Sequence, residues 1–192
     1  MNEIKKLREL SGAGMLNCKK ALEEAGGNFE KALEILRKKG QQIAAKKQTR
    51  AVTEGLIGVY VHGNGKTAAL VEVNCETDFV ARNPEFGEFV HDLAMQVVAM
   101  NPFYLSEKDI PAQIIKKERK IYLEQMKNEK KSAEVIDKII EGKLSKFYQD
   151  VCLLRQPYIK DDKITIEELL KQKIAKIGEN IVIKRFVRYS LN

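Results

Sequence analysis

Near residue 55 the spacing of apolar residues in this 192-residue chain changes from a helical period to a period of two, and that change constrains the fold more than any other feature. Before it, apolar residues recur roughly every three or four positions, as on helices that bury one face. After it, apolar residues alternate with others on both sides of a turn that contains Asn64-Gly65. The alternating residues are Ile57, Val59, Val61, Ala69, Val71 and Val73. This pattern is typical of a β-hairpin.

The first 40 residues predict a module of three short helices. SGAG at 11–14 breaks the first helix, and Gly26-Gly27 ends the second. Asn28 is expected to cap the third helix, and Gly40 to close it. The polar residues 41–54 are predicted as a linker, and their pattern fits either a helical or a flexible one.

Residues 55–192 predict a larger domain that is rich in helices. Pro84 is expected to begin a helix with one apolar face. Two further helices should form an antiparallel helical hairpin over about 110–154, and a short helix should end at Gly178. Asp161-Asp162 are interpreted as a turn.

The last apolar segment, NIVIKRFVRY, predicts a strand that joins the hairpin's sheet, although Arg185 disturbs its alternation. The predicted class is therefore α+β. A small N-terminal three-helix module precedes a core with a three-stranded antiparallel sheet, packed helices and a helical hairpin.

A net charge of +7 makes nucleic-acid binding one hypothesis. Most basic residues, however, alternate with Glu and Asp at helical spacing, as on solvated helix faces. The one dense cluster, Lys46, Lys47 and Arg50, has no aromatic residues between its members, and the chain has no Trp. A basic ribosome- or RNA-associated protein stays open as an alternative to a protein that binds an acidic partner.

The residue types that carry catalysis are sparse. His62 and His91 are the two histidines, which leaves little material for a His-dependent triad or a metal site. GNGKT at 63–67 lies between two predicted strands, whereas a phosphate-binding loop would open a helix. The sequence therefore predicts a binding protein, not an enzyme, with no cofactor and no metal.

Three cysteines, Cys18, Cys75 and Cys152, lie far apart without a CxxC pair, and we expect buried free thiols. No segment approaches the roughly 18 apolar residues of a membrane span. The N-terminus lacks the apolar stretch of a secretory signal and the Arg- and Ser-rich composition of a mitochondrial one. We therefore expect a cytoplasmic protein with no membrane partner.

One junction does not fit a plain scaffold. Asp78 and Phe79 fall between a predicted strand and the helix that begins at Pro84. An exposed aromatic residue beside an acid suits insertion into a partner's crevice. The alternative is an ordinary turn in which Phe79 packs inward and Asp78 caps the helix.

Three stretches resemble the elongation factor Ts family. TDFVARN at 77–83, preceded by EVNCE, is similar to the family's signature. LRELSGAGMLNCKKALEEAGGN at 7–28 resembles its leading module, which is similar to the ubiquitin-associated fold. EGKLSKFYQDVCLLRQPYIKDD at 141–162 resembles its later helical segment. The resemblance covers nearly the whole chain in the expected order.

The resemblance implies a guanine-nucleotide exchange factor that binds the GDP form of elongation factor Tu and promotes GDP release. The family's wedge pair corresponds to Asp78 and Phe79. The residues that flank this pair are Thr77, Val80, Arg82 and Asn83.

Met15 and Leu16 correspond to the family's docking face on the GTPase, although both could instead be core residues of their own module. His62 corresponds to a further partner contact, or else lies at the hairpin tip by accident. Short family members form homodimers, so the resemblance implies a homodimer through the domain at 55–192. It implies no direct contact with nucleic acid. A third possibility is a ubiquitin-like adaptor built on residues 1–40.

Overall fold

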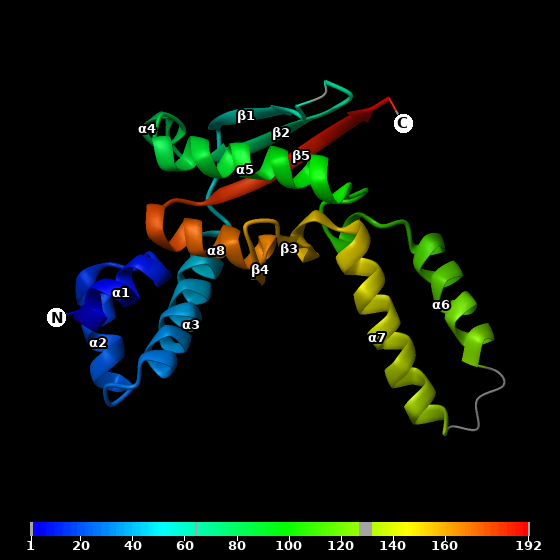
Figure 1. The fold of residues 1–192 in the computed structure, drawn as a ribbon, viewed down its shortest axis with the longest axis horizontal. Helices are drawn as coiled ribbons and strands as arrows, with labels where there is room; N and C mark the ends of the chain where they lie inside the picture. Colours follow the sequence, from blue (N-terminus) through cyan, green and yellow to red (C-terminus); the bar gives the residue numbers. More distant parts are fainter. Residues whose placement is uncertain (1, 64, 127–131, 192) are drawn as a thin grey trace.

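The computed structural model describes residues 2–63, 65–126 and 132–191. An N-terminal helical module and a helical hairpin extend from opposite ends of a body built around a three-stranded sheet (Figure 1). The described residues form eight α-helices. The predicted α+β class, with three N-terminal helices and a three-stranded antiparallel sheet, is confirmed.

The N-terminal module has a small hydrophobic cluster of its own. Its helices are α1 (Asn2–Ser11), α2 (Met15–Glu24) and α3 (Phe29–Lys47). The buried residues of the cluster are Leu7, Cys18, Ala21, Leu22, Ala32 and Leu36. As predicted, Asn28 caps α3, and its Oδ1 accepts a hydrogen bond from the Lys31 N–H at 3.0 Å.

The prediction that Gly40 ends the third helix is wrong, because α3 continues to Lys47. A Cβ added at Gly40 would lie 3.5 Å from the Cβ of Ala175, so this residue faces another helix. A glycine inside a helix costs only about 1 kcal/mol relative to alanine, and packing against a neighbour can offset that cost. Ala44, one turn further on, is buried in the core of the body. The first part of the predicted linker is therefore helical.

The sheet has the order β1-β2-β5, and both pairs are antiparallel. Its strands are β1 (Glu54–Val61), β2 (Thr67–Cys75) and β5 (Ile181–Ser190). The backbone N–H of His62 donates to the Thr67 carbonyl at 2.8 Å and closes the predicted hairpin. Asn64 of the predicted turn lies outside the described residues.

A β-bulge in β5 explains the imperfect alternation of the last strand. Glu72 pairs with Arg185 and Val73 with Ile183, so Lys184 is the extra residue. One extra residue in a strand moves every later side chain to the opposite face from the one that strict alternation predicts. Phe186 can therefore pack against the same core as Ile183, although the two residues are three positions apart.

One face of the sheet is covered by α5 (Pro84–Met100), which begins at Pro84 as predicted. The predicted apolar face of this helix is buried; its residues are Phe86, Phe89, Val90, Leu93, Val97 and Val98. Beside it, α8 (Ile166–Ile177) begins with a capping box between Thr165 and Glu168 and ends at Gly178 in a left-handed conformation. These two helices and the sheet enclose the main core.

The predicted helical hairpin consists of α6 (Ala112–Met126) and α7 (Ala133–Val151). Arg119 joins the two helices through Glu141 at 2.7 Å. The short 3₁₀ helices η1 (Glu107–Asp109) and η2 (Leu153–Arg155) lie at its root. There, buried Gln156 accepts a hydrogen bond from Gln96 of α5 at 3.3 Å and donates to the Met100 carbonyl at 3.2 Å.

A small two-stranded sheet was not predicted. It pairs β3 (Pro157–Tyr158) with β4 (Asp161–Thr165). The predicted turn at Asp161-Asp162 is wrong, because these residues begin β4 and the turn lies at 159–160. The Ile159 N–H donates to Gln96 Oε1 at 2.9 Å. This contact with α5 fixes the turn two residues earlier than the local sequence indicates.

Candidate partner-binding site

The candidate site is the turn between β2 and α5. After Cys75 the chain passes through Glu76 and Thr77 into the single-turn helix α4 (Asp78–Ala81). Thr77 caps this helix, and its Oγ1 accepts a hydrogen bond from the Val80 N–H at 3.4 Å. Asp78 does not cap it. The Asp78 carboxylate instead lies 3.1 Å from the guanidinium of Arg82.

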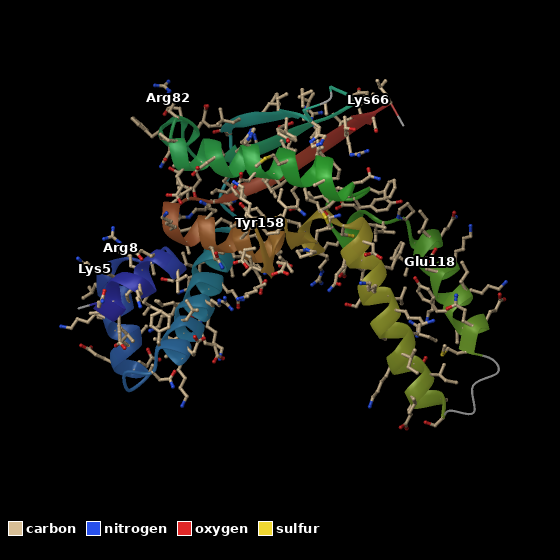
Figure 2. The ribbon with its side chains drawn as sticks, in the orientation of Figure 1. Lys5, Arg8, Lys66, Arg82, Glu118 and Tyr158 are labelled. Atoms are coloured by element: carbon tan, nitrogen blue, oxygen red, sulfur yellow. The ribbon has the colours of Figure 1, made fainter. Side chains whose placement is uncertain are left out.

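The side chains of α4 divide into two directions. Val80 and Ala81 pack against the main core, whereas Phe79 is 82% exposed. The alternative in which Phe79 packs inward is therefore wrong. Figure 2 shows Arg82 projecting outward from the same end of the molecule. Asn83 accepts a hydrogen bond from the Glu85 N–H at 2.9 Å and begins α5.

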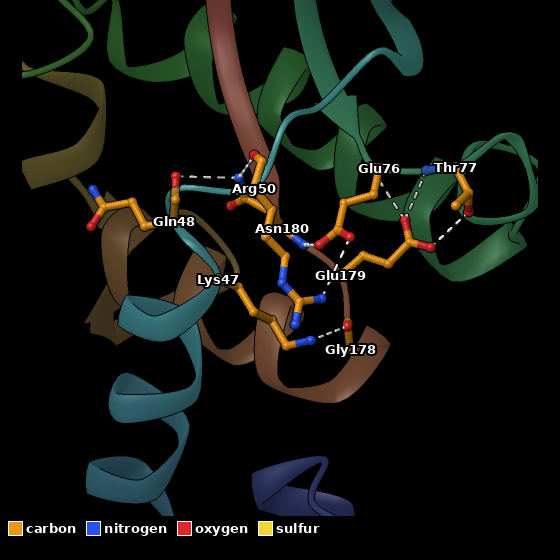
Figure 3. A network of polar contacts seen from close by, with 8 residues as sticks. All are labelled: Lys47, Gln48, Arg50, Glu76, Thr77, Gly178, Glu179 and Asn180. Carbon is orange, nitrogen blue, oxygen red and sulfur yellow. Dashed lines mark hydrogen bonds and ion pairs between the residues drawn. The ribbon is translucent and has the colours of Figure 1, made fainter.

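A carboxylate from the far end of the sequence holds the start of this turn. Glu179 Oε2 accepts hydrogen bonds from the backbone N–H groups of Glu76 and Thr77, both at 3.1 Å. Its Oε1 accepts from the Thr77 hydroxyl at 2.7 Å (Figure 3). In return, Glu76 Oε1 accepts from the backbone N–H of Asn180 at 2.6 Å. The two loops thus bind each other reciprocally.

The segment that follows α3 is attached to the same network. The buried side chain of Asn180 donates to the carbonyl of Arg50 at 2.8 Å, and the Arg50 guanidinium lies 3.5 Å from Glu76 (Figure 3). Lys47 donates to the carbonyl of Gly178. Sequence reasoning missed Glu76, Glu179 and Asn180, because contacts across more than 100 residues leave no local signal.

Met15 and Leu16 lie in the first turn of α2 and are 47% and 64% exposed. Cys18, Ala21 and Leu22 of the same helix are buried in the cluster of the module. The alternative that Met15 and Leu16 are core residues of the module is therefore wrong. In Figure 1 the module and α4 lie at the same end of the molecule.

The structure does not bring His62 together with Phe79. Glu54 pairs with Cys75 at one end of the hairpin and Val61 with Ala68 at the other. Seven residue steps along a strand span roughly 23 Å. The labels of Arg82 and Lys66 in Figure 2 mark these two ends.

Among the described residues, the exposed ring of His62 contacts Tyr60 of β1. Its Nδ1 lies 3.4 Å from the Tyr60 hydroxyl. Tyr60 also meets His91 edge-on, with 5.7 Å between the ring centroids.

Three further observations concern the described part of the chain. All three cysteines are buried and free, as predicted. None of its His, Cys, Asp and Glu residues gather in a group of three or more that could hold a metal ion. None of its helices combines the length and apolar character needed to cross a bilayer.

Known proteins of one family match nearly the whole chain. A family model described as "Elongation factor TS" matches residues 18–192. "Elongation factor Ts" of Carboxydothermus hydrogenoformans is 55% identical over 188 residues, which are 98% of this chain and 87% of the relative. The protein of the same name from Fervidobacterium nodosum is 55% identical over 98% of this chain. That from Thermotoga petrophila is 54% identical over 100% of this chain. Each match covers 95% of the relative.

The chain joins a helical module to a sheet that presents an exposed aromatic turn. Together with these relatives, this arrangement defines a translation elongation factor. The chain belongs to the elongation factor Ts family.

Proposed function

We propose that the protein is a guanine-nucleotide exchange factor that binds the GDP form of elongation factor Tu and promotes GDP release during translation elongation. Membership of the family supports the process and the partner. The single observation that carries the mechanism is Phe79, an aromatic side chain 82% exposed on a turn whose neighbours are held by caps and core packing.

The mechanism is thermodynamic linkage. A GTPase holds GDP through a phosphate-binding loop and a magnesium ion together. Phe79 inserts into the GTPase beside that site and makes contacts that only the open, weakly binding state allows. A ligand that binds one state more tightly shifts the equilibrium toward it, and the affinity for GDP falls by the same factor.

Two elements carry the proposed contacts. Asp78 and Phe79 form the wedge, with Arg82 paired to Asp78 beside it. Thr77, Val80 and Asn83 support the wedge through a cap, core packing and a second cap. Met15 and Leu16 provide docking, because an exposed apolar pair on a small module suits an adaptable contact. His62, at the far end of the hairpin, meets a different domain of the partner.

We also propose a homodimer formed through the outer face of the sheet. Strand pairing places Val59, Leu70 and Val187 in one row across this face, and Val61, Ala68 and Tyr189 in the next. The large apolar side chains of both rows are exposed, Val61 by 55% and Tyr189 by 68%. A contiguous apolar face of this kind favours burial against an identical face related by twofold symmetry.

The factor acts by binding alone, so the proposal includes no catalysis and no cofactor. Two members of the basic cluster at 46–50 already bind within the chain, Lys47 to Gly178 and Arg50 to Glu76. This observation supports a protein partner over nucleic acid. The proposal places the factor in the cytoplasm, where elongation takes place.

The test is release of a fluorescent GDP analogue from elongation factor Tu, with excess unlabelled GDP and increasing amounts of this protein. The proposal expects the release rate to rise and to saturate with the concentration of the protein. An unchanged release rate, together with a strongly salt-dependent affinity for RNA, would support the nucleic-acid alternative instead.

A further inference from the structure

We propose that Glu179 is a positioning residue for the exchange turn, and this proposal rests on the function proposed above. Glu179 lies in the loop between α8 and β5, next to Glu76 and Thr77 at the start of the turn that presents Phe79 (Figure 3). Its carboxylate does not belong to the wedge. The carboxylate instead fixes the backbone of Glu76 and Thr77, which directly precede the wedge.

The turn needs such a residue because α4 cannot hold its own orientation. It has four residues, fewer than an isolated helix needs by a wide margin. Phe79, being 82% exposed, gains little support from packing. The direction of Phe79 therefore depends on the core packing of Val80 and Ala81 and on how the two ends of α4 are fixed. Asn83 and Pro84 fix the far end as the beginning of α5.

Glu179 fixes the near end at the point where the sheet stops. Cys75 and Ile181 are the last paired residues of β2 and β5. The N–H groups of Glu76 and Thr77 lie beyond that pair, and both donate to one oxygen of Glu179 at 3.1 Å. The Glu179 side chain thus accepts hydrogen bonds from two backbone N–H groups that lie past the end of the paired strands. Hydrogen bonds to an ionised carboxylate are about twice as strong as neutral ones.

The other oxygen of Glu179 acts on the cap of α4. The Thr77 hydroxyl donates to Glu179 Oε1 at 2.7 Å, which leaves its lone pairs free to accept from the Val80 N–H. A hydroxyl can donate one hydrogen bond while it accepts others. The hydroxyl proton of Thr77 therefore points away from α4, toward Glu179, and a lone pair of the hydroxyl oxygen points toward the Val80 N–H of the helix. One carboxylate orients both the backbone and the cap that precede Phe79.

The reciprocal contact allows a local test. Glu76 accepts from the Asn180 N–H at 2.6 Å and does not depend on the side chain of Glu179. Replacement of Glu179 by Gln removes the negative charge and leaves one acceptor oxygen, whereas two N–H groups and one hydroxyl of the turn donate to the two oxygens of Glu179. We expect the two loops to stay attached while the start of α4 loosens.

The experiment uses the full chain with Glu179→Gln and Glu179→Ala. The matched control is Asp92→Asn, because Asp92 also joins two elements, accepting from Tyr158 at 2.5 Å and Lys160 at 2.7 Å, and lies on α5 away from the turn. Amide hydrogen exchange reports on residues 76–81. Release of GDP from elongation factor Tu gives the maximal rate at saturation and the half-saturating concentration.

For Glu179→Gln we expect exchange of the Glu76 and Thr77 amides to become about tenfold faster. We expect the maximal release rate to fall about tenfold, with the half-saturating concentration nearly unchanged because docking uses other residues. Glu179→Ala should show the same changes more strongly, and Asp92→Asn neither. Unchanged amide exchange overturns the proposal, and so does faster exchange with a parental maximal rate. If the parent protein does not accelerate release, the proposed function itself fails.

Discussion

Gly58 of β1 lies directly against Val90 of α5, and a Cβ added at Gly58 would be 2.7 Å from both the Cγ1 and the carbonyl oxygen of Val90. No ordinary side chain tolerates such a distance to a backbone atom. The hairpin and α5 can therefore approach closely only because this strand residue has no side chain. The same helix follows the exchange turn, so the contact also sets the scaffold on which that turn is built.

The first prediction is that Gly58→Ala destabilises the protein by about 1–3 kcal/mol, because α5 must move away from the sheet. Gly142→Ala is the control. Gly142 lies within α7 with nothing near an added Cβ, so this change should stabilise the protein by up to about 1 kcal/mol. Urea unfolding measures both. Equal stability of the Gly58 variant and the parent would contradict the close contact.

The second prediction concerns the outer face of the sheet. Sedimentation equilibrium at micromolar concentration should give twice the 21.9 kDa of one chain. Leu70→Lys places a charge at the centre of the proposed interface and should give the monomer. Ile159→Lys is matched in exposure, 39% against 41%, but lies in the turn before β4 and should leave the dimer intact. A parent protein that is monomeric at every concentration would rule out the dimer.

The third prediction concerns docking. Met15→Ala with Leu16→Ala should raise the half-saturating concentration for GDP release about tenfold or more, since apolar anchors cost roughly 1 kcal/mol or more each when truncated. The maximal rate should stay nearly parental, because these residues do not touch the nucleotide site.

The control for docking is a pair of exposed apolar residues on the helical hairpin, each 43% exposed: Leu123→Ala with Val135→Ala. Circular dichroism checks that the module remains folded. If the Met15 and Leu16 variant is folded and binds normally, the docking assignment is wrong.

The fourth prediction concerns alkaline pH. Burial, followed by the charges of Glu107 and Asp109, raises the pKa of the Cys152 thiol from its usual 9.0 to about 11. The native state thus favours the neutral thiol. This contribution to stability is fully present below about pH 9 and is lost as the pH rises toward 11.

The free energy of unfolding should therefore fall between pH 9 and 11. Cys152→Ala should reduce this slope, whatever its effect on the absolute stability. Unfolding in denaturant at a series of pH values measures both slopes. Identical slopes for the two proteins would contradict the raised pKa.

The elements that local patterns determine were predicted, and those that distant contacts determine were not. The β1–β2 hairpin and α5 follow from alternation and from the Pro84 start. The extension of α3 past Gly40 depends on packing near Ala175. The turn before β4 depends on a hydrogen bond to Gln96.

The candidate site divides in the same way. Asp78 and Phe79 belong to one short motif, so the sequence identified the pair. Its pattern did not decide which way the pair points, because Phe79 and Val80 are adjacent apolar residues and either could enter the core. The structure turns Val80 inward and Phe79 outward. The role of Glu179 requires two loops separated by more than 100 residues to meet.

The last prediction concerns Phe79. Phe79→Ala should remove an aromatic anchor, which typically costs about 2–4 kcal/mol at an interface hot spot and corresponds to roughly 30- to 1,000-fold. Part of this loss falls on the open state of the GTPase, so the maximal release rate should drop more than docking does. Asp78→Asn should have a smaller effect, because it keeps the shape and loses the charge beside Arg82.

Phe103→Ala is the matched control, because Phe103 is also an exposed aromatic residue, at 68%, and lies in the loop before η1, away from the turn. Neither Phe variant should shift the melting temperature by more than a few degrees, since neither side chain is buried. A buried Phe would instead lose about 3–5 kcal/mol of stability.

The most direct measurement is stopped-flow release of fluorescent GDP from elongation factor Tu at saturating concentrations of the parent, Phe79→Ala and Phe103→Ala proteins. The wedge mechanism predicts rapid release with the parent and with Phe103→Ala, and a maximal rate at least about fivefold lower with a fully folded Phe79→Ala, because more than half of the loss falls on the open state. Release at the parental rate with Phe79→Ala would contradict it.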